Sequence, residues 1–258
     1  MTDLPRIITD NQSLFAHYQE LQKGDIICGR VRLRPKEEYL LLDLSRRGII
    51  GIPSFISQLC SRSKTFQARL YEWAMIPGTT VIYTIHDLLE TVNHYGKDGI
   101  EEVVVKVDDK NGGLGIFRYR SIEEVYTQSA LGQIPFPYVV QPLIEACRDL
   151  RVIALGDYWE AYERHNPDNF RNNLHCGGAA RPVDLTDEQR RLCSRAMAEN
   201  DFPYAHLDLL VTEDGRNFLT EINLRGGLRG ARITPDDYQR RIKAIERICC
   251  ERAATKRR

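Results

Sequence analysis

The sequence lacks several features that mark whole classes of protein. No apolar run approaches the roughly 18–20 residues that a helix needs to span a bilayer. The 36 Lys and Arg residues are balanced by 36 Asp and Glu residues, so no net field attracts nucleic acid or an anionic membrane. The opening residues, MTDLPRIITDN, contain no charged leader followed by an apolar block. We therefore expect a cytoplasmic protein with neither a membrane nor a nucleic acid as partner.

Cysteine is scarce and scattered. The seven cysteines form an odd set without a CxxC pair: Cys28, Cys60, Cys147, Cys176, Cys193, Cys249 and Cys250. This pattern favours reduced thiols in the cytosol over a disulfide framework or a zinc site. A GxGxxG segment after the first predicted strand is also missing, so the N-terminal region is not expected to bind a dinucleotide.

The composition is that of an ordinary globular protein: of the 258 residues, 42% are hydrophobic and 28% are charged. In the first 60 residues, short apolar segments at 6–9, 25–28 and 48–53 alternate with helical stretches at 14–21 and 38–47. This alternation predicts a small α/β unit with a parallel sheet, which we interpret as a substrate-side domain. For the whole chain we expect three units, at residues 1–62, 63–136 and 137–258.

A lysine and a glycine-rich segment follow one another in the middle unit. Lys106 lies near the end of a strand predicted at 102–107, and glycines at 112, 113 and 115 precede a second strand at 116–119. A glycine-rich hairpin loop can bring backbone N–H groups against phosphate oxygens, although Asn-Gly-Gly is also an ordinary hairpin turn. A lysine in a buried strand is rare without a partner, and a bound anion would supply one.

The next predicted strand, at 138–144, contains Pro142, which suits an edge strand or a strand end. Such an irregular strand leaves unpaired backbone groups that could form hydrogen bonds with the edge of an adenine ring. The alternative is an ordinary edge strand without a ligand. A hairpin predicted at 149–164 then carries Arg151 and Arg164.

A polar loop at 165–178 follows this hairpin and is too long for a tight turn. Arg171, Asn173 and His175 are all hydrogen-bond donors within it. The loop either binds an anion or is a surface loop without a binding role.

A second predicted hairpin carries two carboxylates and a carboxamide. Its strands cover 206–211 and 217–223, joined by Glu213-Asp214-Gly215. Period-two geometry places Glu221 and Asn223 on one face, and pairing can bring Asp208 beside them. Such an oxygen-rich face suits Mg²⁺ together with substrate phosphates. The alternative is a solvated hairpin face.

From Lys64 to Gly230 the order of these motifs resembles the ATP-grasp superfamily, most closely its RimK-type branch of amino-acid ligases. The strongest local match is NFRNNLHCGG at 169–178, which looks like the branch's F-R-x-N-L-H-x-G-G phosphate-binding segment. The segments VVVKVDDKNGGLG, VQPLIE, DLR and LDLL…TEIN also occur in order. The resemblance covers about two-thirds of the chain. It implies an ATP-grasp fold of the α/β (α+β) class, in which two α/β subdomains grip ATP behind a short parallel α/β N-terminal domain.

The resemblance also implies roles for individual residues. Phosphate contacts would come from Lys64 and Lys106, under a lid formed by Gly112, Gly113 and Gly115. The hinge facing adenine would comprise Gln141, Pro142, Leu143 and Ile144, with Asp149 at the sugar. The γ-phosphate would be held by Arg171 and Asn173, and Asn172 between them would also contact the nucleotide. One or two Mg²⁺ ions, or Mn²⁺, would be bound by Asp208, Glu221 and Asn223. The transferring phosphoryl group or the acceptor carboxylate would be supported by Arg151 and Arg164.

The function implied is ATP-dependent ligation of a carboxylate to an amine, with ATP and Mg²⁺ as cofactors. Phosphorylation turns one carboxylate oxygen into a leaving group, and positioning plus cations suffices for that step. The partners would be a small-molecule or peptide carboxylate and an amine or amino acid, and a homo-oligomer is compatible with the short N-terminal unit. The alternatives are a kinase or phosphotransferase of the same superfamily, or a nucleotide-binding partner protein without catalysis.

The sequence departs from the family pattern just after Asn223. The branch commonly continues with a Ser-Pro-Gly turn, whereas residues 224–230 read LRGGLRG. By the resemblance this region faces the acceptor. Arg225 and Arg229 are either carboxylate-binding side chains or ordinary surface arginines.

Overall fold

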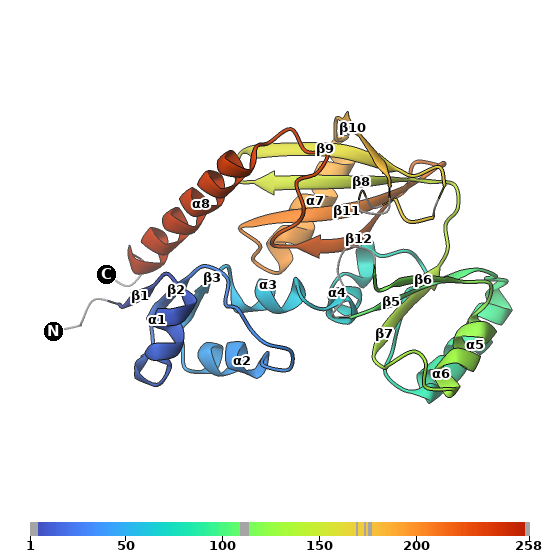
Figure 1. Cartoon of the computed structure of the whole chain (residues 1–258), viewed down its shortest axis with the longest axis horizontal. Helices are drawn as coiled ribbons and strands as arrows, with labels where there is room; N and C mark the ends of the chain where they lie inside the picture. Colours follow the sequence, from blue (N-terminus) through green and yellow to red (C-terminus); the bar gives the residue numbers. More distant parts are fainter. Residues whose placement is uncertain (1–4, 109–113, 169, 173, 175–176, 256–258) are drawn as a thin grey trace.

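Three sheets, each with its own helices, make up the computed structural model (Figure 1). The structure describes residues 5–108, 114–168, 170–172, 174 and 177–255. No helix in this described part is both long enough and apolar enough to cross a membrane.

The N-terminal sheet is parallel, in the order β1-β2-β3, as the alternation of elements predicts. Its strands are β1 (Ile7–Ile8), β2 (Ile26–Cys28) and β3 (Ile50–Ile52). Its neighbours in the chain are the helical segments α1 (Asn11–Ala16), η1 (Tyr18–Glu20), α2 (Tyr39–Arg46) and α3 (Phe55–Cys60). Both faces are covered: Ile27 packs in a cluster with Leu14 and Leu41, whereas Ile26 packs against Cys250. Burial on both faces explains why β2 is an unbroken apolar run.

The second sheet has the order β4-β7-β5-β6 and is antiparallel throughout. Its strands are β4 (Thr80–Ile82), β5 (Val103–Val107), β6 (Ile116–Tyr119) and β7 (Tyr138–Pro142). Two helices pack their apolar residues against one face, α5 (Ile85–Asp98) and α6 (Ile122–Ala130). Pro142 is the last residue of β7, an inner strand, so the strand-end interpretation is the right one.

The third sheet is the largest and is also antiparallel, in the order β10-β9-β8-β11-β12. Its strands are β8 (Cys147–Leu155), β9 (Tyr158–His165), β10 (Ala179–Val183), β11 (Tyr204–Thr212) and β12 (Asn217–Asn223). Helix α7 (Asp187–Glu199) contacts β11 and β12, and Thr186 and Gln189 form a capping box at its start. Strand β10 was not predicted, because its sequence, AARPV, carries little strand signal.

Two helices join the sheets. The first is α4 (Lys64–Leu70), which is followed by the 3-10 turn η2 (Glu72–Ala74). Gln67 on α4 donates to the carbonyl of Ile222 at 2.9 Å and accepts from its N–H at 3.0 Å, which fixes α4 against β12. Helix α8 (Pro235–Thr255) runs from the large sheet to the N-terminal sheet (Figure 1). Helix α4 also contacts β4 and β7, so it links the second sheet to the third, whereas α8 links the third sheet to the N-terminal sheet.

Candidate active site

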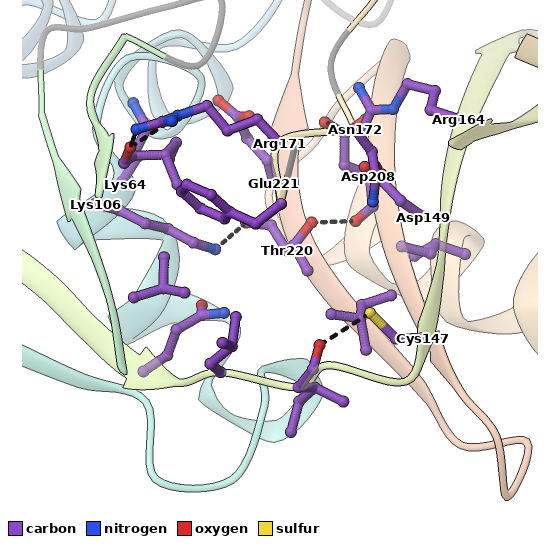
Figure 2. A pocket seen from close by; sticks show the side chains of 18 residues that line it. Lys64, Lys106, Cys147, Asp149, Arg164, Arg171, Asn172, Asp208, Thr220 and Glu221 are labelled. Atoms are coloured by element: carbon purple, nitrogen blue, oxygen red, sulfur yellow. Dashed lines mark hydrogen bonds and ion pairs between the residues drawn. The ribbon is translucent and has the colours of Figure 1, made fainter. Parts of the chain in front are cut away.

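A cavity lies between the second and third sheets, lined by residues from both. Figure 2 shows Lys64 and Lys106 on one side and Asp149, Arg164 and Asp208 on the other, with Thr220 and Glu221 between them. The structure therefore brings together charged residues that lie more than 150 positions apart in the chain. Apolar side chains complete the lining: Val104, Ile116, Leu143, Ile144, Leu209 and Leu210.

Two carboxylates and two arginines form a continuous ion-pair network on one face of the large sheet. Asp208 on β11 accepts from Arg151 on β8, with Nη2 to Oδ2 at 2.8 Å. Arg164 on β9 lies 3.1 Å from Asp208 and 2.5 Å from Asp149. The network follows from strand register, because Asp208 is paired with Arg151 and Asp149 with Arg164.

Burial and charge act in opposite directions on this network. Burial alone would raise the pKa of Asp208, but Arg151 and Arg164 outweigh it and hold that pKa well below its ordinary value. Burial also raises the pKa of Asp149, and there Arg164 offsets the effect only in part. The two carboxylates favour the charged form of Arg164 against its burial and raise its pKa. Asp208 is thus a permanently charged group at the cavity wall.

A β-bulge in β12 shapes the floor of the cavity. Asp208 pairs with Glu221 but Leu209 pairs with Leu219, so Thr220 is the extra residue. The bulge lets Leu219 and Ile222 both point into the core while Glu221 lines the cavity. It also presents the carbonyl of Thr220 to the ammonium of Lys106, at 3.3 Å.

Lys106 on β5 reaches this floor from the opposite sheet (Figure 2). Burial lowers the pKa of Lys106 to about 8, and the carboxylate of Glu221 partly offsets that effect. The positive charge of Lys64 lowers the same pKa further. A buried ammonium beside a second lysine is an arrangement that an anion would stabilise.

Asp108 holds the start of α4 in place. Its carboxylate accepts from the N–H of Lys64 at 2.5 Å, and from the hydroxyls of Ser63 and Thr65 at 2.8 and 2.7 Å. Sequence reasoning assigned Asp108 no role, because its partners come from a helix more than 40 residues away. The serine or threonine pattern at the start of α4 was the only available signal.

The segment after β9 lies over the cavity from the other side. Phe170, Arg171 and Asn172 line it, and the guanidinium of Arg171 lies 4.4 Å from the ring of Phe170. Arg171 also donates to the carbonyl of Ile116 on β6, with Nη2 to O at 2.6 Å. This segment therefore connects the two sheets across the cavity.

Most residues predicted from the sequence line the cavity, but not all. Those that do are Lys64, Lys106, Gln141, Leu143, Ile144, Asp149, Arg164, Arg171, Asn172, Asp208 and Glu221. Four others are described but lie outside its lining, namely Gly115, Pro142, Arg151 and Asn223. Gly112, Gly113 and Asn173 fall outside the residues that the structure describes. Thr220, Phe170 and Cys147 line the cavity and were not predicted.

The metal hypothesis depends on a small ligand set. Within the described residues there is no cluster of three or more His, Cys, Asp or Glu side chains that could hold a metal ion. Asp208 and Glu221 are a pair of carboxylates on neighbouring strands, and Asn223 follows Glu221 by two residues. A Mg²⁺ ion here would need oxygen atoms from a substrate as well.

The chain has relatives of known family. A family model described as a RimK-like ATP-grasp domain matches residues 62–244. The protein named probable alpha-L-glutamate ligase 1 of Shewanella amazonensis is 32% identical over 152 residues, which are 57% of this chain and 48% of that protein. The chain thus spans about half the length of the curated relatives it matches.

Solved structures show a similar fold. D-cycloserine synthetase DcsG aligns with a TM-score of 0.62 and 19% identity, over 88% of this chain and 84% of that one. The ATP-grasp ligase PsnB, solved with a minimal precursor, Mg and ADP, aligns with a TM-score of 0.55 and 18% identity, over 81% and 67%. These matches confirm the predicted α/β ATP-grasp fold. Because the family model covers both sheets around the cavity, the chain belongs to the RimK-like ATP-grasp family, as its order of motifs predicts.

Proposed function

We propose that the chain is an ATP-dependent ligase that joins a carboxylate to an amine. The observation that supports this most is the cavity itself, which Lys64, Lys106 and Arg171 line together with the carboxylates of Asp208 and Glu221. Family membership and the names of the relatives, which include amino-acid ligases, point to the same activity.

The proposed reaction has two steps. A substrate carboxylate oxygen attacks the γ-phosphorus of ATP, which forms an acyl phosphate and releases ADP. An amine then attacks the acyl carbon, which forms the amide and releases phosphate and a proton. Lys64, Lys106 and Arg171 would stabilise the negative charge on the phosphoryl oxygens during transfer. The segment around Arg171 would exclude water from the acyl phosphate.

The residues present fit a bound Mg²⁺ ion. Carboxylate and amide oxygens are hard ligands, and Mg²⁺ is commonly held by one or two carboxylates together with phosphate oxygens. Asp208 accepts from Arg151 and Arg164, yet a carboxylate has about four lone-pair positions, so it retains capacity for a metal. Asp208, Glu221 and Asn223 would hold the ion, which supplies positive charge to the phosphate oxygens.

The remaining predicted residues take supporting roles in this proposal. Gln141, Leu143 and Ile144 would flank the adenine, beside Val104 and Leu210. Asp149 would lie at the sugar, and Arg164 would act at the phosphoryl group while also pairing with Asp149. Arg151 lies outside the lining, so its contribution would be to orient Asp208.

The test is an ADP-release assay with Mg-ATP and candidate acids, in the presence and absence of an amine. Hydroxylamine serves as a second amine, because it converts an acyl phosphate into a hydroxamate. A ligase releases ADP and forms amide or hydroxamate in equal amounts. Phosphorylated product that accumulates without an amide would instead identify a kinase. Glu221→Gln should abolish turnover, whereas Glu213→Gln, at an exposed turn, should not.

A further inference from the structure

The last turns of α8 pack on one face of the N-terminal sheet (Figure 1). The buried residues of this helix are Tyr238, Ile242, Glu246 and Cys250, and their spacing of four places them along one side. Cys250 is the last of them and packs in a cluster with Ile26 of β2. This side of α8 therefore brings a thiol to the sheet.

The sheet presents a second thiol at the same place. Ile26 and Cys28 are two residues apart in β2, so they share the face toward α8, whereas Ile27 packs on the opposite face. Cys28 is partly exposed and lines a cavity of about 400 Å³ between the N-terminal sheet and α8. Cys250 is buried. Cys28 is therefore the thiol of this pair that solvent reaches.

The two sulfur atoms interact directly. A hydrogen bond with the thiol of Cys250 lowers the pKa of Cys28, against the effects of burial and of the charge of Glu246. The same hydrogen bond, together with burial, raises the pKa of Cys250. Of the cysteines that the structure describes, only Cys28 has a pKa below its ordinary value. When one thiol of the pair ionises it is that of Cys28, and the thiolate is the reactive form of cysteine.

A third cysteine, Cys249, is adjacent to Cys250 in the chain but has a different position on the helix. An α-helix turns by about 100° per residue, so Cys249 lies beside the buried stripe that ends at Cys250. Burial raises the pKa of Cys249, and Cys28 acts on it through charge, not through a hydrogen bond. The structure therefore distinguishes Cys250 from its neighbour as the partner of Cys28.

We propose that Cys28 and Cys250 form a reversible disulfide that ties the N-terminal sheet to α8. The oxidant is a low-molecular-weight disulfide such as oxidised glutathione. The thiolate of Cys28 attacks one sulfur atom of that disulfide, which forms a mixed disulfide and releases one glutathione thiolate. The thiol of Cys250 then attacks the sulfur of Cys28 and gives its proton to the departing second glutathione. Two protein thiols are oxidised, and one glutathione disulfide is reduced to two thiols.

The bond would change how the N-terminal sheet is held. Around these thiols the sheet and α8 are joined by apolar contacts, among them those of Ile52, Ala253 and Ala254. Cys28 and Cys250 lie more than 200 residues apart, so the disulfide would close most of the chain into one loop. Closing a long loop restricts the unfolded chain. The oxidised protein should therefore unfold at a higher temperature, whether or not the chain is a ligase.

The test is incubation of the full chain with oxidised and reduced glutathione, then alkylation of the remaining thiols and mass spectrometry without reductant. We expect the wild type to lose two alkylatable thiols and to yield a cross-link between Cys28 and the tryptic peptide 248–252. Its unfolding midpoint should rise by at least about 5 °C and return to its first value on reduction. Cys249→Ser is the matched control and should behave as the wild type does. Cys250→Ser and Cys28→Ser should form no internal disulfide and show no rise.

A disulfide that persists in Cys250→Ser, or one that is lost in Cys249→Ser, would overturn the proposal. So would disulfide-linked dimers as the main product, a wild type that keeps both thiols, or an oxidised wild type with an unchanged unfolding midpoint. If Cys250→Ser does not fold, Cys28→Ser and Cys249→Ser still identify the pair, because both positions are partly exposed.

Discussion

The carboxylate of Asp108 lies at the N-terminal end of α4 and accepts from the N–H of Lys64 at 2.5 Å and of Thr65 at 3.3 Å. Asp108 follows β5, the strand that carries Lys106. One carboxylate therefore fixes the two lysines relative to each other, although they come from different elements. Lys64 and Lys106 both line the cavity, and this contact joins the two elements that carry them.

We predict that Asp108→Ala weakens the binding of Mg-ATP without removing any group that would touch the nucleotide. Loss of a helix cap typically costs about 1 kcal/mol, and a freed Lys64 would lose part of its contribution to phosphate binding. An increase in Kd of about fivefold or more, measured by titration, is the expected result. Asp87→Ala is the matched control, because Asp87 caps α5 away from the cavity. Equal effects of the two variants on Kd would contradict the prediction.

Lys106 gives a prediction on pH. Burial lowers the pKa of Lys106 to about 8, and only its charged form attracts phosphate. Nucleotide binding should therefore raise that pKa and take up protons when the pH is near or above 8. We expect the affinity for Mg-ATP to fall as the pH rises from 7.5 to 9.5, by up to about tenfold per unit above the pKa.

Titration in buffers of different ionisation enthalpy measures the proton uptake directly. In Lys106→Met the affinity should be weak and nearly independent of pH over the same range. A wild-type affinity that stays constant between pH 7.5 and 9.5 would show that Lys106 does not contact the phosphates.

The residues around the cavity show how far sequence reasoning reaches. Strand pairing and period-two alternation predicted correctly that Asp208 and Glu221 are neighbours. The bulge at Thr220 was not predictable, because nothing in NFLTEIN marks one residue as extra. The pairing of Arg164 with both Asp149 and Asp208 was also beyond reach, since it requires the order of three strands. Local patterns identify such residues, whereas tertiary register decides which of them meet.

Arg164 provides a prediction on stability. Removing Arg164 would leave the buried carboxylates of Asp149 and Asp208 with less positive charge beside them. Breaking a buried ion pair typically costs about 3–5 kcal/mol. We expect Arg164→Met to lower the free energy of unfolding, measured with urea, by roughly that amount. Arg148→Met is the control: the side chain of Arg148 is 48% exposed, and its partner Glu163 keeps a second ion pair with Arg181, so the variant should cost less than about 1 kcal/mol. Similar losses in the two variants would contradict the buried network.

Replacing Glu221 tests the binding of Mg²⁺ separately from the binding of the nucleotide. In Glu221→Gln we expect Mg²⁺ to strengthen ATP binding much less than in the wild type, because one of two carboxylates near the phosphates is neutralised. Binding of ATP in the presence of a chelator should change little or improve, since a negative charge is removed. The measurement is a set of ATP titrations at several Mg²⁺ concentrations. An identical Mg²⁺ dependence in wild type and variant would mean that Glu221 is not a metal ligand.

His206 leads to a prediction for acid solution. Its ring is buried, its Nε2 lies 2.9 Å from the hydroxyl of Tyr238, and burial together with the charge of Arg151 lowers its pKa to about 3. The unfolded chain binds a proton at this histidine near pH 6.5, whereas the folded chain does so only near pH 3. The contribution of neutral His206 to the free energy of unfolding is therefore fully present above pH 6.5 and is lost as the pH falls from 6.5 towards 3.

Between pH 7 and pH 5 the loss from this one group should be about 2 kcal/mol in the free energy of unfolding. Urea titrations across this range measure it before most carboxylates titrate. His206→Gln should lower the stability at pH 7 but flatten the pH dependence, because the residue that takes up the proton on unfolding is gone. His86→Gln, at an exposed position on α5, should keep the wild-type slope. A slope that persists in His206→Gln would assign the acid sensitivity to other groups.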